Sequence, residues 1–236
     1  MSKRAVLLAG GKGTRLRPYT VVLPKPLMPL DDYPILEVVI RQLIRYGFTH
    51  LTIAINYQAE LIQAFFGHGE KWNIKIDYSL EEKPLSTMGP LKLIKDLPEN
   101  FLVMNGDVLT DLDFEEFYQH HINNGHLFTT SAFQREERSE FGVLEVDDSN
   151  RLTGFKEKPA ILLDVSMGIY MINRKVLDFI PENEFYGYDT LMKDMLKSGN
   201  PAHIRRHKGY WLDIGRVDDY ARAIEEFPAI KDKFLT

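Results

Sequence analysis

Apolar positions follow two alternating periods through the first half of the chain. Short apolar runs are typical of buried strands, and they predict strands over residues 5–9, 51–55, 74–78 and 101–104. Between them, apolar residues recur with helical spacing, which predicts helices over residues 35–46, 59–66, 90–97 and 114–124. Strands that alternate with helices indicate a mainly parallel sheet with helices on both faces.

The second half has a more mixed pattern. It predicts strands over residues 127–133, 143–146, 152–155 and 166–172, and helices over residues 175–180, 189–197 and 217–226. Residues 147–150 (Asp-Asp-Ser-Asn) are typical of a hairpin turn. We therefore expect one α/β domain over residues 1–236, whose later part adds antiparallel strands to the sheet.

Composition narrows the class of protein. The chain has 236 residues, 44% of them hydrophobic, and no cysteine, which excludes disulfides and thiolate metal sites. A net charge of −5 argues against a general nucleic-acid binder. No apolar stretch approaches the roughly 20 residues of a membrane span, and the run 5–9 is too short for a secretory signal. We expect a cytoplasmic protein with no membrane or nucleic-acid partner, and a homo-oligomer is compatible with the sequence.

The first 30 residues are basic although the chain is acidic. They contain no Asp or Glu, and their cationic residues are Lys3, Arg4, Lys12, Arg15, Arg17 and Lys25. Such a segment indicates either a site for a compact anion or a solvated basic face.

A glycine-rich segment directly follows the first predicted strand. Gly10, Gly11 and Gly13 let the backbone approach a ligand closely, and Thr14 and Arg15 add a hydroxyl and a cationic fork that suit phosphate oxygens. The run matches neither the P-loop pattern nor the dinucleotide fingerprint.

Downstream, Lys25 stands between Pro24 and Pro26. Prolines fix their own φ and restrict the residue before them. The backbone that carries the ammonium group of Lys25 is therefore predicted to be extended and rigid.

Several motifs in order resemble the signature of the sugar-nucleotide pyrophosphorylase (sugar-1-phosphate nucleotidyltransferase) family. They are LAGGKGTRL at 8–16, LPKPLMP at 23–29, EKPLSTMGP at 82–90, NGD at 105–107, FGV at 141–143, FKEKP at 155–159, GIY at 168–170 and YWLDIG at 210–215. The likeness covers almost the whole chain and is closest to mannose-1-phosphate and heptose-1-phosphate guanylyltransferases.

This resemblance implies a Rossmann-like, three-layer mixed sheet of the GT-A-like type. It also implies a nucleotide-binding part at about 1–112 and a sugar-phosphate-binding part at about 113–236. We expect no carboxyl-terminal β-helix domain, because the chain ends about 20 residues after the Trp211 motif. The implied reaction joins a nucleoside triphosphate to a sugar 1-phosphate and releases pyrophosphate.

The resemblance also implies residue roles at the nucleotide. Arg15, Lys25 and Asp107 would be catalytic, with Arg15 on the departing pyrophosphate and Lys25 at the α-phosphate. The nucleotide-binding set would be Leu8, Ala9, Gly10, Gly11, Gly13, Thr14, Arg15, Lys25, Glu82, Gly89 and Asp107. Glu82 is the candidate base reader, because one carboxylate can accept both hydrogen bonds from the N1 and N2 edge of guanine.

A metal and a sugar site follow from the same likeness. Asp107 and Asp213 would hold Mg²⁺, for which oxygen ligands and phosphates are suited. The sugar phosphate would bind to Gly142, Glu157, Lys158, Ser166 and Gly168, with Glu157 on the hydroxyls and Lys158 on the phosphate.

Three positions depart from the usual pattern of the family. Ser86 replaces a glycine, Met88 replaces a small residue near the expected base site, and Ser166 replaces an asparagine. The first two bear on the choice of base and the third on the choice of sugar.

Other readings stay open. Uridylyl, thymidylyl or cytidylyl transfer to another phosphate is one. A catalytically silent, nucleotide-sugar-binding regulator is another, although it should lack Arg15, Lys25 or a metal aspartate. A glycosyltransferase would need a D-x-D motif. Asp111 and Asp113 have that spacing, but we expect them to cap the following helix.

Overall fold

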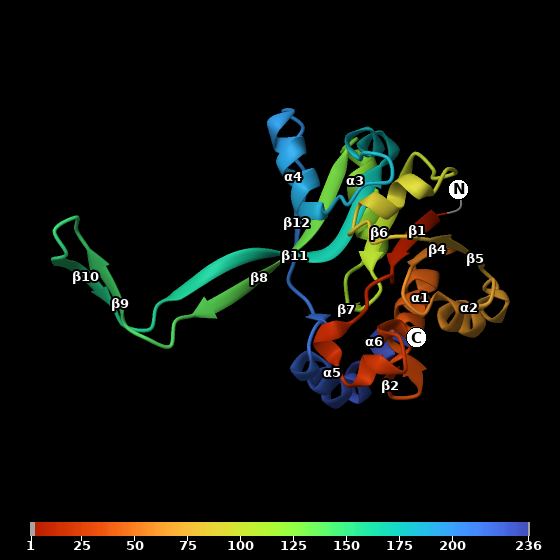
Figure 1. Cartoon of the computed structure of the whole chain (residues 1–236), viewed down its shortest axis with the longest axis horizontal. Coiled ribbons are helices and arrows are strands. Elements are labelled where there is room, and N and C mark those ends of the chain that lie inside the picture. The colour runs from red at the N-terminus through yellow and green to blue at the C-terminus, as the bar shows by residue number, and fades with distance from the viewer. Residues whose placement is uncertain (1–2, 236) are drawn as a thin grey trace.

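A seven-stranded mixed sheet forms the centre of the protein, with the strand order β12-β8-β11-β6-β1-β4-β5 (Figure 1). The computed structural model describes residues 3–235. In sheet order, the strands are β12 (His203–His207), β8 (Phe128–Arg138), β11 (Ala160–Asn173), β6 (Asn100–Asn105), β1 (Lys3–Leu8), β4 (Phe48–Ile55) and β5 (Lys75–Leu80).

Strand direction divides this sheet in two. β1 is parallel to β4 and β6, and β4 is parallel to β5. β11 is antiparallel to both β6 and β8. The predicted parallel first half with antiparallel strands added later is therefore confirmed.

Helices cover both faces of the sheet. The α-helices are α1 (Ile35–Arg45), α2 (Ala59–Phe66), α3 (Phe114–Asn123), α4 (Tyr188–Lys197), α5 (Val217–Ile230) and α6 (Asp232–Leu235). Ala5 and Leu7 of β1 pack in one core with α1, α2 and α3, whereas Val6 packs in a second core with α4. Because successive side chains of a strand point to opposite faces, this alternation makes three layers, as expected.

A third apolar cluster joins α5 and α6 to α1 and to the loop after β1. Leu16 and Met28 of that loop pack against Ala223 and Phe227 of α5. Two short strand pairs support this region: β2 (Pro29–Leu30) with β3 (Tyr33–Pro34), and β7 (Val108–Thr110) with β13 (Trp211–Asp213). The carboxyl-terminal helices therefore hold the amino-terminal loop.

Some predicted elements differ in type. The helices expected over 90–97 and 175–180 are 3₁₀ helices, η5 (Gly89–Leu93) and η6 (Arg174–Phe179). The first cannot continue as an α-helix, because the chain turns and directs the carbonyl of Asp96 to the buried guanidinium of Arg4 at 2.9 Å. The four remaining 3₁₀ helices are η1 (Thr14–Leu16), η2 (Tyr19–Val21), η3 (Lys25–Leu27) and η4 (Glu70–Trp72).

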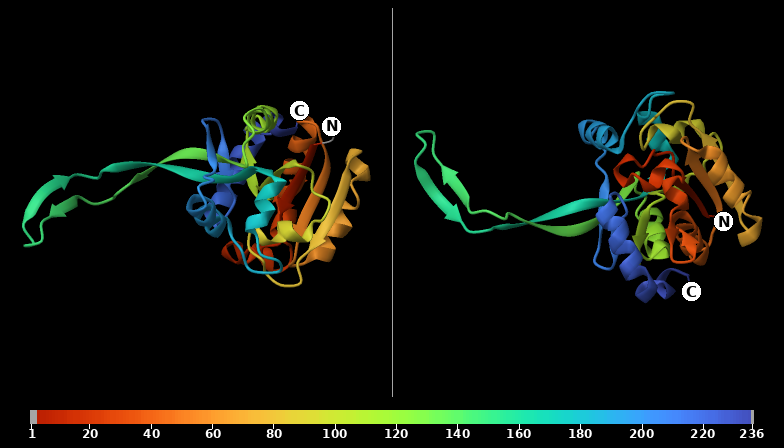
Figure 2. Two further views of the ribbon diagram at one scale, coloured as in Figure 1. Left: turned by 90° about the horizontal axis from the view of Figure 1, so that it is seen from above. Right: turned by 60° about the horizontal axis from the view of Figure 1, so that its bottom comes forward.

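β8 and β11 continue beyond the sheet as a two-stranded ribbon. It ends in a hairpin of β9 (Val143–Val146) and β10 (Leu152–Lys156), well away from the rest of the protein (Figures 1 and 2). We call residues 134–164 the arm and residues 139–159 its tip. The predicted turn at 147–150 closes the hairpin, with Asp147 N–H donating to the carbonyl of Arg151 at 3.0 Å.

Asp113 caps α3, as expected, and accepts a hydrogen bond from Glu116 N–H at 2.9 Å. Over residues 3–235, no helix is both long and apolar enough to cross a membrane.

His121 of α3 lies buried against the sheet. Its Nδ1 is 2.8 Å from Thr129 Oγ1 and its Nε2 is 3.2 Å from Asn100 Oδ1. Burial, together with the nearby His126, His120 and His203, lowers the pKa of His121 to about 4.

This shift predicts a loss of stability in acid. The unfolded chain takes up a proton on His121 near its ordinary pKa of 6.5, whereas the folded chain does so only near 4. The free energy of unfolding should therefore fall between these pH values, by up to roughly 3 kcal/mol. In urea titrations, we expect His121→Gln to reduce the change of the free energy of unfolding with pH. His68→Gln, at an exposed histidine, should leave that change as it is in the wild type. If the free energy of unfolding depended on pH equally in both variants, the effect could not be attributed to His121.

Candidate active site

A pocket of about 660 Å³ lies at the carboxyl ends of four parallel strands. Its walls come from the glycine loop after β1, Asn56 after β4, Glu81 after β5 and residues 105–107 after β6. Because these strands are parallel, their carboxyl ends meet at one edge of the sheet, where ligands of open α/β sheets bind. Nine of the predicted nucleotide-binding residues line this pocket: Leu8, Ala9, Gly10, Gly11, Gly13, Thr14, Arg15, Lys25 and Asp107.

The glycine loop is held by contacts with the loop that follows it. Gly13 has a φ of 59°, in the left-handed region, and its carbonyl accepts a hydrogen bond from Thr20 Oγ1 at 2.8 Å. Lys12, Thr14 and Arg15 remain exposed and line the pocket. The Arg15 guanidinium makes no hydrogen bond or ion pair within the part of the chain that the structure describes, so it is available to an anion.

Lys25 forms an ion pair with Asp107 at the centre of the pocket. The two side chains are 11% and 22% exposed. Lys25 begins η3, and its carbonyl accepts Met28 N–H at 3.1 Å. The extended conformation predicted for this segment is therefore correct at Pro24 only, because Pro26 lies inside a 3₁₀ turn, where its fixed φ and missing N–H are tolerated.

The backbone brings Asp213 next to Asp107. β13 pairs with β7, so that Asp213 lies opposite Val108, and Ile214 N–H donates to the carbonyl of Asp107 at 3.1 Å. Burial, and then the charge of Asp107, raises the pKa of Asp213. Asp107 Oδ1 is buried and has no hydrogen-bond partner. Two adjacent carboxylates with a free buried oxygen fit a divalent cation, whose positive charge would stabilise both.

A buried glutamate, Glu81, also lines the pocket. Glu81 is 8% exposed and lines the pocket, and its Oε1 is 2.8 Å from the position that a Cβ on Gly10 would occupy. Its Oε2 accepts Leu85 N–H at 3.0 Å. Burial raises the pKa of Glu81, while the hydrogen bond from Leu85 lowers it by less.

The profile of the nucleotidyl transferase family matches residues 4–229. The chain belongs to this family. A UTP–glucose-1-phosphate uridylyltransferase of Synechocystis is 34% identical over 94% of this chain, and a mannose-1-phosphate guanyltransferase of Hypocrea jecorina is 33% identical over 92% of it. The chain spans 62% of the length of each of these relatives.

Solved structures confirm the expected GT-A-like fold. HddC from Yersinia pseudotuberculosis matches this chain with a TM-score of 0.74 and 25% identity, over 95% of this chain and 99% of the other. A Bacillus anthracis protein, provisionally named a glucose-1-phosphate thymidylyltransferase, matches with a TM-score of 0.76 at 22% identity, over 95% and 94% of the two chains.

Two residues predicted to bind the nucleotide do not line the pocket. Glu82 is exposed and lies outside it, whereas the neighbouring Glu81 lines it. The backbone explains the difference: residues 75–80 form β5, so Glu81 is the first residue past the strand and points inward. Gly89 is buried away from the pocket, and its N–H donates to the carbonyl of Tyr186.

Two of the residues that depart from the family pattern, Met88 and Ser86, lie in different surroundings. Met88, which was expected near the base site, is fully buried in the second core and does not line the pocket. Ser86 lines the pocket with a φ of 66°, the left-handed region in which glycine is favoured. A serine at the position of the usual family glycine therefore keeps a backbone conformation that glycine adopts more readily.

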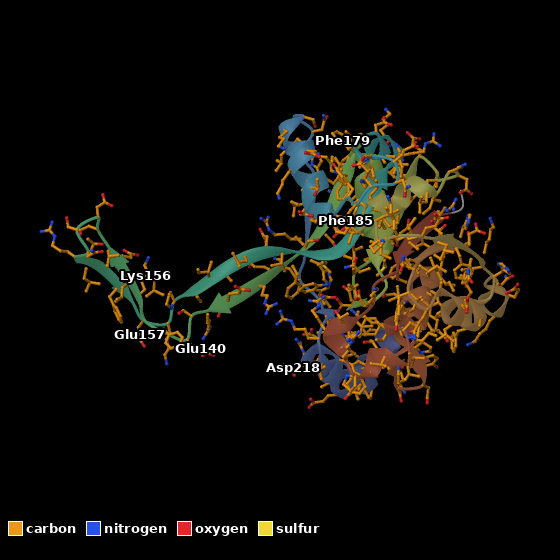
Figure 3. The ribbon with its side chains drawn as sticks, viewed as in Figure 1. Glu140, Lys156, Glu157, Phe179, Phe185 and Asp218 are labelled. Carbon is orange, nitrogen blue, oxygen red and sulfur yellow. The ribbon has the colours of Figure 1, made fainter. Side chains whose placement is uncertain are left out.

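The predicted sugar-phosphate residues fall in two places. Ser166 and Gly168 lie in the body, at the irregular register of β11, and Gly168 packs against Asn105 of the pocket wall. Gly142, Glu157 and Lys158 lie on the exposed tip of the arm (Figure 3 labels Glu157). Within one chain, the structure therefore does not bring the five residues together.

Three residues that line the pocket lie outside every motif identified in the sequence: Glu81, Asn56 and Phe185. Asn56 directly follows β4 and donates from Nδ2 to the carbonyl of Glu81 at 2.8 Å. A polar residue after each parallel strand was a signal that could have identified both. Phe185 comes from a loop before α4 and is 73% exposed (Figure 3), and no periodic pattern marks it.

Two glycines of the loop should respond differently to alanine. A Cβ on Gly13 would lie 2.9 Å from Thr20 Cγ2 at a left-handed φ, whereas a Cβ on Gly11 meets no atom within 4 Å. We expect Gly13→Ala to lower the free energy of unfolding by about 1–2 kcal/mol and Gly11→Ala to leave it nearly unchanged, as measured by urea denaturation. Equal losses would show that the loop geometry does not depend on Gly13.

Proposed function

We propose that this nucleotidyl transferase joins a nucleoside triphosphate, with GTP favoured, to a sugar 1-phosphate and releases pyrophosphate. One observation carries the proposal: a single pocket gathers the glycine loop, Arg15, Lys25 and Asp107. The names of relatives support the class of reaction, because those of Synechocystis and Hypocrea jecorina are both nucleotidyltransferases acting on a sugar 1-phosphate.

The cationic residues suit a triphosphate that is being cleaved. Lys25 is largely buried beside Asp107, and Arg15 lies on the exposed loop that follows β1. In phosphoryl and nucleotidyl transfer, catalysis comes mostly from positioning and from stabilising charge as it develops. Lys25 would therefore stabilise the α-phosphate and Arg15 the departing pyrophosphate.

Asp107 and Asp213 would hold Mg²⁺, which would neutralise phosphate charge when bound. Mg²⁺ in proteins often has only one or two carboxylate ligands, with phosphates and water completing its shell. Within residues 3–235, no three His, Cys, Asp or Glu side chains form a metal cluster.

The reaction needs no general base on the protein. An oxygen of the sugar phosphate is already anionic near neutral pH. It attacks the α-phosphorus of the triphosphate, a new P–O bond forms, and the bond to the β-phosphate breaks so that pyrophosphate leaves with the electron pair. The protein side chains would orient the sugar phosphate and the α-phosphate and stabilise their negative charge.

Glu81 favours guanine. Guanine offers two neighbouring donors, N1–H and N2–H₂, to one carboxylate, whereas uracil offers one donor between two acceptors. The Glu81 carboxylate is largely removed from water beside Gly10, where an unmatched polar contact costs roughly 1–3 kcal/mol. Uridylyl transfer remains the second candidate, because the Synechocystis relative, at 34% identity, is a uridylyltransferase. For the sugar, mannose- or heptose-type 1-phosphates are favoured.

Nucleotide preference tests this assignment. Pyrophosphate release from four nucleoside triphosphates with several sugar 1-phosphates should be fastest with GTP and should stop in excess chelator. We expect Glu81→Gln to reduce the ratio of kcat/KM for GTP over UTP about ten- to hundred-fold. Glu82→Gln is the matched control and should leave the ratio unchanged, because Glu82 is exposed outside the pocket. A wild-type preference for UTP, CTP or dTTP would overturn the guanylyl assignment and leave the reaction class intact.

Charge stabilisation predicts the effect of removing Lys25 or Arg15. Each alanine variant should stay folded and lose about 10²–10³ in kcat, the usual effect of losing one such interaction. Lys83→Ala, at an exposed lysine that does not line the pocket, is the control and should keep normal turnover. A folded Lys25→Ala or Arg15→Ala protein with near-normal kcat would remove the corresponding role.

A further inference from the structure

The arm carries a large apolar surface that the described part of the chain leaves uncovered. Its exposed apolar side chains include Phe141 (77%), Leu144 (60%), Leu152 (61%), Phe155 (57%), Ile161 (60%) and Leu162 (60%). None of residues 134–164 belongs to the three apolar cores. Isolated two-stranded hairpins are marginal in water, and exposed apolar patches of this kind mark interaction surfaces.

The tip gathers part of the proposed sugar-phosphate set. The position of a Cβ on Gly142 is 3.2 Å from Glu157 Oε2, so these two residues form one local group. Lys158 follows Glu157, and Ser139 N–H donates to the carbonyl of Pro159 at 3.0 Å, which closes the tip at its base. The tip is therefore an ordered unit that presents a carboxylate and an ammonium group.

The arm is held away from the pocket of its own chain. From Val165–Phe133 to Ala160–Arg138, β11 and β8 pair one to one, and the irregular register lies only between Ser166 and Tyr170. The extended residues between Val165 and Ala160 alone carry the chain roughly 16 Å outward, and Glu157 lies beyond Ala160 on the tip. At the base, Arg206 of β12 donates to Asp164 from Nη2 at 2.7 Å and from Nε at 3.0 Å, which fixes the direction of departure. Folding back would require this regular ladder to break or bend.

We propose that two copies of this chain exchange arms, so that the tip of each copy completes the sugar-phosphate end of the other copy's pocket. In each composite site, one copy supplies Arg15, Lys25 and Asp107, and the other supplies Glu157 and Lys158. Lys158 would meet the phosphate of the second substrate, because Arg15 and Lys25 of the pocket are assigned to the triphosphate. This inference rests on the proposed function.

A second copy fits the arm better than an unrelated partner does. The residues missing from the pocket, by the likeness to the family, are the same residues that the arm carries at its tip. When two copies exchange arms about a two-fold axis, both contribute the same surface to the interface, and the assembly is complete as a dimer. Both apolar tips are then covered, and no further surface is left to propagate a chain of molecules.

Complementation between two inactive variants tests the exchange. Lys25→Ala impairs the body, and Glu157→Ala with Lys158→Ala impairs the tip. Heterodimers of the two variants, co-expressed with different affinity tags and purified on both, contain one composite site with every residue intact. They should therefore show about half of the wild-type turnover per dimer, although each variant alone is nearly inactive.

The outcomes separate the exchange from the proposed function. Wild-type transfer activity establishes the function independently. Inactive heterodimers would show that the tip serves its own chain, failure to co-purify would show that no dimer forms, and a fully active tip variant would show that the tip takes no part. Each of these results would overturn the exchange.

Sedimentation velocity gives a readout without activity. Replacing residues 139–159 by Asn-Gly joins Arg138 to Ala160, which already lie opposite each other in the ladder of β8 and β11, and it removes no residue of the three cores. We expect a dimeric wild type and a monomeric shortened chain. Leu144→Ser with Phe155→Ser, a cross-strand pair of the hairpin, keeps the arm's length and should also weaken the dimer. A dimer that persists in both variants, or a monomeric wild type, would overturn the proposal.

Discussion

The parallel pairing of β1 with β6 is the constraint on which the site depends. Leu8 lies opposite Asn105 in that pairing, so the glycine loop and Asp107 leave the sheet side by side. Gly106 N–H donates to the carbonyl of Leu8 at 3.0 Å and continues the contact past the strands. If β1 shifted by one residue against β6, each side chain of β1 would point to the opposite face of the sheet. The glycine loop and Asp107 would then no longer leave the sheet side by side at Lys25.

Much of this arrangement could be predicted from the sequence, because it follows from local patterns. The apolar runs place the strands, and residues just past parallel strands must share one edge of the sheet. The glycine loop was found in this way, whereas the roles expected for Lys25 and Asp107 came from the resemblance to the family. Glu81 was missed by one position, because a strand end defined by apolar residues is uncertain by a residue or two, and Ser79 and Leu80 still belong to β5.

Other features depend on contacts between distant segments, which periodicity does not report. Met88 is apolar and could have lined the pocket or the core, and only its position against Tyr186 decides for the core. The separation of Glu157 and Lys158 from Ser166 and Gly168 has the same origin. A motif fixes which residues belong together in a family, but the length and direction of a strand fix where they lie in one chain, and here β11 is long enough to carry the motif away from the body.

The pairing of β13 with β7 also has a consequence during synthesis. Asp213 reaches Asp107 only after more than a hundred further residues have been added, and α5 then packs on Leu16 of the glycine loop. At about 5–20 residues per second, the loop is made on the order of 10 s or more before its last supports emerge from the ribosome. Contacts of such long sequence separation slow folding, so a partly synthesised chain has the glycine loop before it has the contacts that support it.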